Sequence, residues 1–368
     1  MRSDPLVGSL EASGQALLQM QGLTVHFPVR SGMSGRKQVV QAVDDVWLDV
    51  RAGETVGLVG ESGSGKTTLG YSVLGHYRPT AGRVIFDGED VTGLEGKRLQ
   101  RLRRNMQMVF QDPYGSLNPR MRVEEIVAEP LVCHGVATDR GDVRRRVEEL
   151  LAMCGMPAEA ADRFPHAFSG GQRQRIGIAR ALALGPRFLV ADEPTSALDV
   201  SVQAQVVNLL QDLQRDLALA YLFISHDLSV VRHISDRIAI MYLGQVVEVA
   251  ASDSIFDNPR HPYTEALLSA IPVPDPRSGW HEQRIRLRGD LPSPINPPPG
   301  CRFNTRCPIA EDICSERVPV FEQKADGHWA ACHLSTSAVT SNHTPVEFGP
   351  ARGRNRSSES PPPDNPTT

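Results

Sequence analysis

A glycine-rich segment near residue 60 constrains the fold of this 368-residue chain more than any other feature of its sequence. The segment reads GESGSGKT from Gly60 to Thr67, and it follows a short apolar run, TVGLVG, that begins at Thr55. An apolar run bounded by glycines predicts a buried strand, and Thr68 opens a predicted helix. The strand, loop and helix fit the pattern G-x-x-x-x-G-K-[ST], in which backbone N–H groups surround phosphate oxygens.

The side chains of this loop predict nucleotide chemistry as well. Lys66 can reach the β- and γ-phosphates of a nucleotide, and the Thr67 hydroxyl can ligate Mg²⁺. The residues that we expect to bind the nucleotide here are Gly60, Glu61, Ser62, Gly63, Ser64, Gly65, Lys66, Thr67 and Thr68.

An acidic pair supplies the second half of such a site. Asp192 and Glu193 end the apolar run FLVADE that begins at Phe188. We expect Asp192 to hold Mg²⁺ and Glu193 to orient the attacking water. An acidic pair after an apolar strand is common, so its weight comes from its combination with the glycine-rich loop.

The hydrophobic pattern alternates between strands and helices, which predicts an α/β layer architecture. Strands are predicted at 23–27, 39–50, 55–60, 187–191 and 221–224, and as a pair around Gly244 within 237–249; helices are predicted at 203–218 and over most of 113–165, with breaks at Pro130 and Gly135, and a loop at 30–37.

Composition excludes several classes of protein. The chain has 39 basic and 43 acidic residues and a net charge of −4, so no global charge attracts it to nucleic acid or anionic lipid. No apolar run reaches the roughly 18 residues that span a bilayer. Asp4, Pro5 and Glu11 interrupt any signal-peptide core, which predicts a cytoplasmic protein.

A third motif lies between the other two. The sequence FSGGQ at residues 168–172 resembles the LSGGQ signature of ATP-binding-cassette (ABC) ATPases, with phenylalanine in place of the usual leucine. Three further residues follow the order of that family: Gln111 resembles the Q-loop glutamine, Asp199 in SALD the D-loop aspartate, and His226 the switch histidine. The resemblance covers about residues 20–335.

This resemblance implies an α/β fold, a P-loop NTPase cassette with a RecA-like core, an antiparallel β subdomain and a helical subdomain. A small cysteine-containing extension would follow it. The implied boundaries are a flexible tail at 1–19, the ATPase domain at 20–270 with its helical subdomain at about 113–180, the extension at 271–335 and a disordered tail at 336–368.

The segments FQDPYGSLNPR at 110–120 and HPYT at 261–264 are similar to the oligopeptide/dipeptide (peptide/nickel) branch of bacterial ABC importers, and most to its second ATPase subunit. Membership would imply import of peptides or a related small solute, powered by ATP at the cytoplasmic face of the membrane. The implied partners are two transmembrane permease subunits, a second and paralogous ABC ATPase and, indirectly, an extracytoplasmic solute-binding protein, without nucleic acid.

The family mechanism places two cassettes head to tail around two ATP molecules. The signature residues that would contact the ATP held by the facing subunit are Ser169, Gly170, Gly171 and Gln172. A hydroxyl and N–H groups at a helix N-terminus suit a γ-phosphate.

Four further residues receive roles from the resemblance. Gln111 would sense Mg²⁺ and water, His226 would contact the γ-phosphate, and Asp199 would organise the dimer interface unless it is an ordinary helix cap. An aromatic residue just after the first strand would stack on adenine. Phe27 is the candidate and His26 is the rival; alternatively, Phe27 is only a half-buried residue of the strand without a role in binding.

Four of the six cysteines, Cys301, Cys307, Cys314 and Cys332, lie within 32 residues of one another. The spacing C-x5-C-x6-C-x17-C is wider than that of structural zinc knuckles, and it is similar to the segment that binds a [4Fe–4S] cluster in some peptide-permease ATPases. An iron–sulfur cluster, zinc and free thiols all stay open.

Two alternatives complete the hypotheses. A soluble ABC ATPase that acts on nucleic acid or ribosomes would fit the same catalytic motifs, but this chain has a single cassette and no basic surplus. A catalytically inactive regulatory cassette is disfavoured because Lys66, Asp192, Glu193 and His226 are all present.

Overall fold

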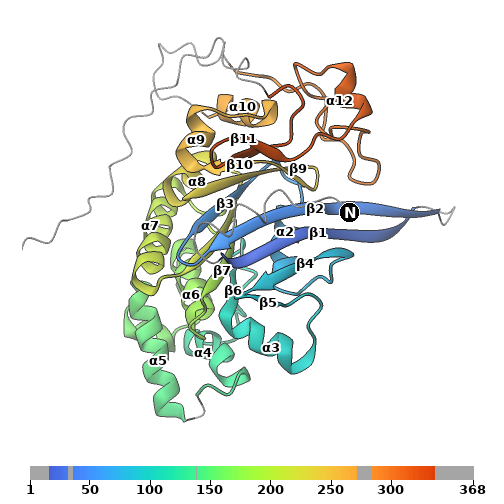
Figure 1. Cartoon of the computed structure of the whole chain (residues 1–368). Coiled ribbons are helices and arrows are strands. Elements are labelled where there is room, and N and C mark those ends of the chain that lie inside the picture. Colours follow the sequence, from blue (N-terminus) through green and yellow to red (C-terminus); the bar gives the residue numbers. More distant parts are fainter. Residues whose placement is uncertain (1–15, 32–35, 138, 272–283, 336–368) are drawn as a thin grey trace, which may run out of the picture.

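The computed structural model describes residues 16–31, 36–137, 139–271 and 284–335 (Figure 1). The tail expected at 336–368 and most of the one expected at 1–19 lie outside these residues. The described strands form a four-stranded sheet in the order β2-β1-β4-β5 and an eight-stranded sheet in the order β11-β12-β10-β9-β3-β8-β7-β6. This architecture confirms the predicted α/β class.

The strands are β1 (Ala16–Ser31), β2 (Arg36–Arg51), β3 (Thr55–Val59), β4 (Ala81–Phe86), β5 (Glu89–Asp90), β6 (Met106–Val109), β7 (Phe188–Asp192), β8 (Ala220–Ser225), β9 (Arg237–Tyr242), β10 (Gln245–Ala251), β11 (Glu322–Ala325) and β12 (His328–Ala330). The α-helices are α2 (Lys66–Val73), α3 (Gly96–Asn105), α4 (Val123–Cys133), α5 (Arg140–Met153), α6 (Gly170–Leu182), α7 (Val200–Leu217), α8 (Leu228–Ile234), α9 (Ser252–Asp257), α10 (Pro262–Ser269) and α12 (Asp312–Glu316).

The centre of the large sheet is parallel and covered on both faces. Strands β9, β3, β8, β7 and β6 pair in parallel, and every residue of β3, β7 and β8 is buried. Alternate residues face different hydrophobic clusters: Leu189 and Phe223 pack with α7, whereas Phe188 and Leu222 pack with the β1–β2 hairpin. Burial on both faces explains why these strands read as continuous apolar runs.

The antiparallel hairpin of β1 and β2 is longer than the sequence predicts. Strand β1 begins at Ala16, so the boundary expected for the flexible tail at residue 19 is wrong for its last residues. Leu17 and Leu18 of β1 are buried in the hydrophobic cluster that also contains residues of β3 and β7, and Leu18 pairs with Val50 of β2. The loop expected at 30–37 is also shorter, because β1 reaches Ser31 and β2 starts at Arg36.

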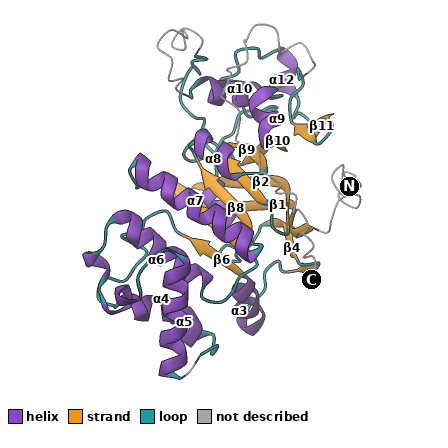
Figure 2. Ribbon diagram, turned by 90° about the vertical axis from the view of Figure 1, so that its left-hand side faces the viewer, coloured by secondary structure: helices purple, strands orange, loops and turns teal. Residues whose placement is uncertain are grey.

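Helices α4, α5 and α6 lie together at one end of the molecule (Figures 1 and 2). The predicted break at Pro130 is wrong, because Pro130 lies inside α4. Buried Ile126, Val127 and Leu131 pack that helix, and this packing outweighs the lost backbone hydrogen bond. The break predicted at Gly135 is confirmed, since Gly135 follows the helix with a φ of 63°.

The C-terminal strands and helices lie at the opposite end, above the β1–β2 hairpin in Figure 1. A fully buried carboxylate, Glu248 on β10, ties them to the large sheet. It accepts hydrogen bonds from the backbone N–H of His261 at 3.0 Å, from the Thr264 hydroxyl, and from His328 Nε2 at 2.6 Å. Helix α10 and strand β12 are thereby fixed to β10.

Within the described residues, none of the helices combines the length and the apolar character that a bilayer span requires.

The buried His261 generates a prediction for stability. Its Nδ1 accepts the N–H of Tyr263 at 3.1 Å, and burial lowers the pKa of this imidazole to about 3. In the unfolded chain this histidine binds a proton as the pH drops below about 6.5, whereas in the folded chain it does not. The free energy of unfolding therefore decreases as the pH is lowered below 6.5, by up to about 1.4 kcal/mol per pH unit. We expect His261→Asn, which keeps a capping oxygen, to make this slope shallower.

The measurement is chemical unfolding of the wild type and His261→Asn at several pH values between 7 and 4.5. Exposed His166 provides the matched control, and His166→Asn should leave the slope unchanged. Parallel pH profiles for the wild type and His261→Asn would show that this histidine does not govern acid stability.

Candidate functional site

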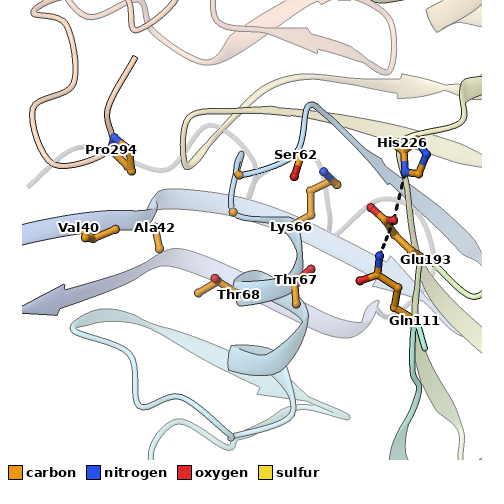
Figure 3. A pocket seen from close by; sticks show the side chains of 12 residues that line it. Val40, Ala42, Ser62, Lys66, Thr67, Thr68, Gln111, Glu193, His226 and Pro294 are labelled. Carbon is orange, nitrogen blue, oxygen red and sulfur yellow. Dashed lines mark hydrogen bonds and ion pairs between the residues drawn. The ribbon is translucent and has the colours of Figure 1, made fainter. Parts of the chain in front are cut away.

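The glycine-rich loop lies where the sequence predicts, between the buried strand β3 and helix α2 (Figure 3). Gly63 and Gly65 adopt φ values of 82° and 104°, a region that only glycine enters readily. Gly65 is the N-cap of α2, so the loop's backbone N–H groups and the helix N-terminus meet at one place. This arrangement can bind an anion such as phosphate.

Lys66 points back across the loop. Its Nζ donates to the carbonyl oxygens of Gly60 at 2.7 Å and Glu61 at 2.9 Å. Burial lowers the pKa of this ammonium group. The loop thus holds a buried lysine with hydrogen bonds that a phosphate group can replace.

Asp192 and Thr67 lie close together beneath the loop. The Thr67 hydroxyl donates to Asp192 Oδ1 at 3.2 Å, and burial raises the pKa of the Asp192 carboxyl to about 6. A hydroxyl and a carboxylate are the hard oxygen donors that Mg²⁺ prefers. The two side chains therefore fit a magnesium site next to the phosphate loop.

A second carboxylate lies between two polar side chains from neighbouring parts of the sheet edge. Glu193 Oε2 accepts a hydrogen bond from Gln111 Nε2 at 3.0 Å and lies 3.1 Å from His226 Nδ1 (Figure 3). Glu193 has a φ of 44°, an unfavourable backbone conformation for a residue with a side chain. An oriented carboxylate flanked by an amide and an imidazole can position a water molecule.

These groups surround one cavity of about 520 Å³. Its lining residues are Val40, Ala42, Ser62, Gly63, Gly65, Lys66, Thr67, Thr68, Gln111, Glu193, His226 and Pro294. The cavity lies in the size range of small-molecule sites. The structure thus brings Glu193, Gln111 and His226 to the cavity that the glycine-rich loop lines, and Thr67 joins Asp192 to that loop.

The aromatic side chain proposed for adenine lies beside this cavity. The Phe27 ring packs edge-on against Tyr77 at 5.1 Å and is not among the lining residues, and His26 Nε2 lies 3.3 Å from Asp44. Val40, directly opposite Phe27 in the β1–β2 ladder, lines the cavity instead. The adenine-stacking role of Phe27 stays a prediction.

The signature segment lies outside this cavity, at the N-terminus of α6. The Ser169 Oγ accepts the N–H of Gln172 at 3.3 Å, and Gln172 Oε1 accepts the N–H of Ser169 at 3.0 Å. This capping box stabilises the helix end and leaves Ser169 exposed. Asp199 is the N-cap of α7, where its carboxylate accepts the N–H of Val202 at 2.9 Å.

The four C-terminal cysteines are free thiols in the structure. Burial raises the pKa of Cys301 and Cys307 to about 11 and raises that of Cys332. Among the described residues, no group of three or more histidine, cysteine or acidic side chains lies where it could hold a metal ion. The predicted iron–sulfur cluster is therefore not supported.

Sequence reasoning missed several residues from outside the motifs that contact the glycine-rich loop or line the cavity. Tyr263 and Arg306 both bond to Glu61, while Val40 and Pro294 line the cavity wall. HPYT, which contains Tyr263, is visible in the sequence only as a mark of the importer branch. Arg306 lies 245 residues from Glu61, and no spacing connects the two.

Comparison with known sequences places these features in a family. Residues 43–196 match the family described as ABC transporter, and residues 247–314 match the oligopeptide/dipeptide transporter C-terminal region. The chain is 52% identical over 325 residues to the oligopeptide transport ATP-binding protein AppF of Bacillus subtilis (strain 168), covering 88% of this chain and 98% of that protein. It is 50% identical over 331 residues to the probable peptide ABC transporter ATP-binding protein y4tS of Sinorhizobium fredii (strain NBRC 101917 / NGR234), covering 90% and 93%.

Solved structures agree on the fold. The dimeric, post-hydrolysis structure of the ATP-binding cassette MJ0796 with ADP and Pi is 30% identical with a TM-score of 0.57, covering 64% of this chain and 98% of that chain. The cbiO1 structure from Clostridium perfringens, part of the ABC transporter complex cbiONQ, is 25% identical with a TM-score of 0.56, covering 66% and 91%. The predicted cassette fold is confirmed. The chain belongs to the ABC ATPases, as an ATP-binding subunit of the oligopeptide/dipeptide transporter branch.

Proposed function

We propose that this chain hydrolyses ATP to power the import of peptides, or a related small solute, through separate transmembrane subunits. One observation carries the proposal: Gln111 and His226 hold the Glu193 carboxylate at a cavity that the phosphate-binding loop also lines. The peptide cargo rests on the family match and on relatives named for peptide transport.

In this proposal the loop N–H groups bind the phosphates of ATP, and Lys66 exchanges its bonds to Gly60 and Glu61 for bonds to the β- and γ-phosphates. Thr67 and Asp192 would hold Mg²⁺, which would neutralise charge on the phosphate oxygens. Phe27 is proposed to contact adenine from beside the cavity.

Glu193 is proposed to orient the attacking water, because its carboxylate is fixed from two sides. Gln111 and His226 direct its oxygen, and His226 is 59% exposed, so its ring can also reach a γ-phosphate. Phosphoryl transfer depends mainly on positioning and charge stabilisation, and these residues supply both.

A second cassette is proposed to complete the site. Ser169, Gly170, Gly171 and Gln172 lie at a helix N-terminus outside this chain's own cavity, which suits contact with a nucleotide held by a facing subunit. Asp199 is proposed to lie at the same interface, and the facing subunit to be a paralogue.

The remaining partners follow from the transporter role. We place the chain on the cytoplasmic face of the membrane, with two permease subunits docking near Gln111 to Arg122 and an extracytoplasmic solute-binding protein acting through them. The alternative of a soluble ATPase that acts on nucleic acid or ribosomes finds no support in the relatives described above.

Purification of the tagged chain from detergent-solubilised membranes tests the transporter role. We expect two multi-span proteins and a second ABC ATPase to accompany it. The assembly, reconstituted in liposomes, should accumulate labelled peptides only when ATP is supplied on the side of the ATPase. Recovery from the soluble fraction with ribosomes or nucleic acid would contradict the proposal.

Replacement of Glu193 tests the hydrolytic step. We expect Glu193→Gln to lower the turnover of ATP by at least about 100-fold, because the amide cannot act on water as a carboxylate does. ATP binding should persist, so ATP-bound dimers should accumulate in size-exclusion chromatography. Glu159→Gln is the control. Glu159 is exposed and does not line the cavity, so this variant should hydrolyse ATP at the wild-type rate. Near-normal turnover by Glu193→Gln would remove this residue from the mechanism.

A further inference from the structure

The C-terminal region contacts the phosphate-binding loop directly at Glu61, through the side chains of Arg306 and Tyr263. The Glu61 carboxylate accepts two hydrogen bonds from Arg306, at 2.8 and 3.2 Å. Its backbone N–H donates to the Tyr263 hydroxyl at 2.9 Å, and its carbonyl oxygen accepts from Lys66 Nζ at 2.9 Å. Backbone and side chain of Glu61 thus join the C-terminal region to the buried lysine.

The Arg306–Glu61 pair differs from an ordinary surface ion pair. The Arg306 side chain is only 9% exposed, and its guanidinium lies 5.9 Å from the Tyr242 ring centre. Tyr242 packs in turn against Tyr263 at 4.7 Å and Phe303 at 5.2 Å. Two parallel hydrogen bonds in such surroundings fix geometry far better than a solvated pair.

A neighbouring arginine supports a turn that contacts the loop at Ser64. Arg302, 8% exposed at its side chain, donates to the Leu243 carbonyl oxygen at 2.6 Å and to Asp44 Oδ2 at 2.5 Å. Gly244, the residue after Leu243, donates its N–H to the carbonyl oxygen of Ser64 in the loop at 2.8 Å. Arg306 therefore contacts the loop directly through Glu61, whereas Arg302 supports it indirectly, through the turn at Leu243 and Gly244.

We propose that Arg306 is a positioning residue for ATP hydrolysis. It holds Glu61 in place, so that the loop N–H groups and the Lys66 ammonium are correctly oriented toward the phosphates of ATP. This inference rests on the proposed ATPase function and adds a role for the C-terminal region in the nucleotide site itself. Tyr263 acts with Arg306 by fixing the N–H of Glu61. The region is thus part of the catalytic unit.

The proposal predicts a defined kinetic loss. Arg306→Gln removes the charge-assisted pair, and we expect kcat/KM for ATP to fall about 10- to 100-fold. Part of the loss should appear in KM, since the loop binds ground state and transition state alike, and part in kcat, because Lys66 is displaced. Arg306→Lys keeps the charge without the two-pronged contact and should recover only part of the activity.

A double-mutant cycle separates positioning from general support of the fold. Glu61→Gln, Arg306→Gln and the double variant are compared in the full-length protein, with Arg317→Gln as a control at an exposed arginine of the same region. We expect the double variant to be no worse than the worse single variant, because both remove one interaction. Arg317→Gln should keep the wild-type kcat and KM.

Two outcomes would overturn the proposal. One is multiplicative losses in the cycle. The other is a folded Arg306→Gln protein with wild-type kcat and KM that differs only by a lower thermal midpoint. ATP affinity, measured calorimetrically on the Glu193→Gln background, gives a readout that does not depend on turnover and should weaken with Arg306→Gln. Failure of the wild type to bind or hydrolyse ATP would instead overturn the proposed function.

Discussion

The tight enclosure of the phosphate-binding loop is the constraint on which the rest of this structure depends. A Cβ atom at Gly60 would lie 2.1 Å from the carbonyl oxygen of Met241, and one at Gly65 would lie 2.1 Å from that of Ala42. Side chains at these positions would force strand β9 or strand β2 away. The loop is therefore wedged between the large sheet and the hairpin, and its N–H groups are oriented before any ligand arrives.

The parallel sheet explains why the polar residues meet at this loop. Strands β8, β7 and β6 are neighbours, and His226, Glu193 and Gln111 each follow one of them. Carboxyl ends of parallel strands share one edge, so groups far apart in sequence become neighbours there. These residues could be predicted because each follows an apolar run in a pattern similar to a known family. The structure adds the contacts through which Glu193 is held.

Other features could not be predicted, because local patterns do not report the partner of a residue. Pro130 was expected to end a helix, yet tertiary packing of its buried neighbours outweighs the backbone penalty. Strand β1 is longer than the strand predicted at 23–27, because residues 1 to about 19 show no clear hydrophobic period although those from Ala16 onward belong to the ladder. The cysteine spacing leaves an iron–sulfur cluster, zinc and free thiols open, and the described thiols do not form a metal site. Arg306 carries no signal at all in the sequence.

Polar burial gives the C-terminal region its fixed position. Packing of apolar surfaces tolerates small shifts, but a buried carboxylate requires every one of its donors in place. Glu248 holds the backbone at the start of α10 and the ring of His328 on β12, so neither element can slide along β10 without leaving a buried charge unpaired. Tyr263 is the second residue of the same helix, and its hydroxyl accepts the N–H of Glu61 in the loop. The buried network around Glu248 therefore fixes the start of the helix that carries Tyr263, and through Tyr263 it reaches the phosphate-binding loop.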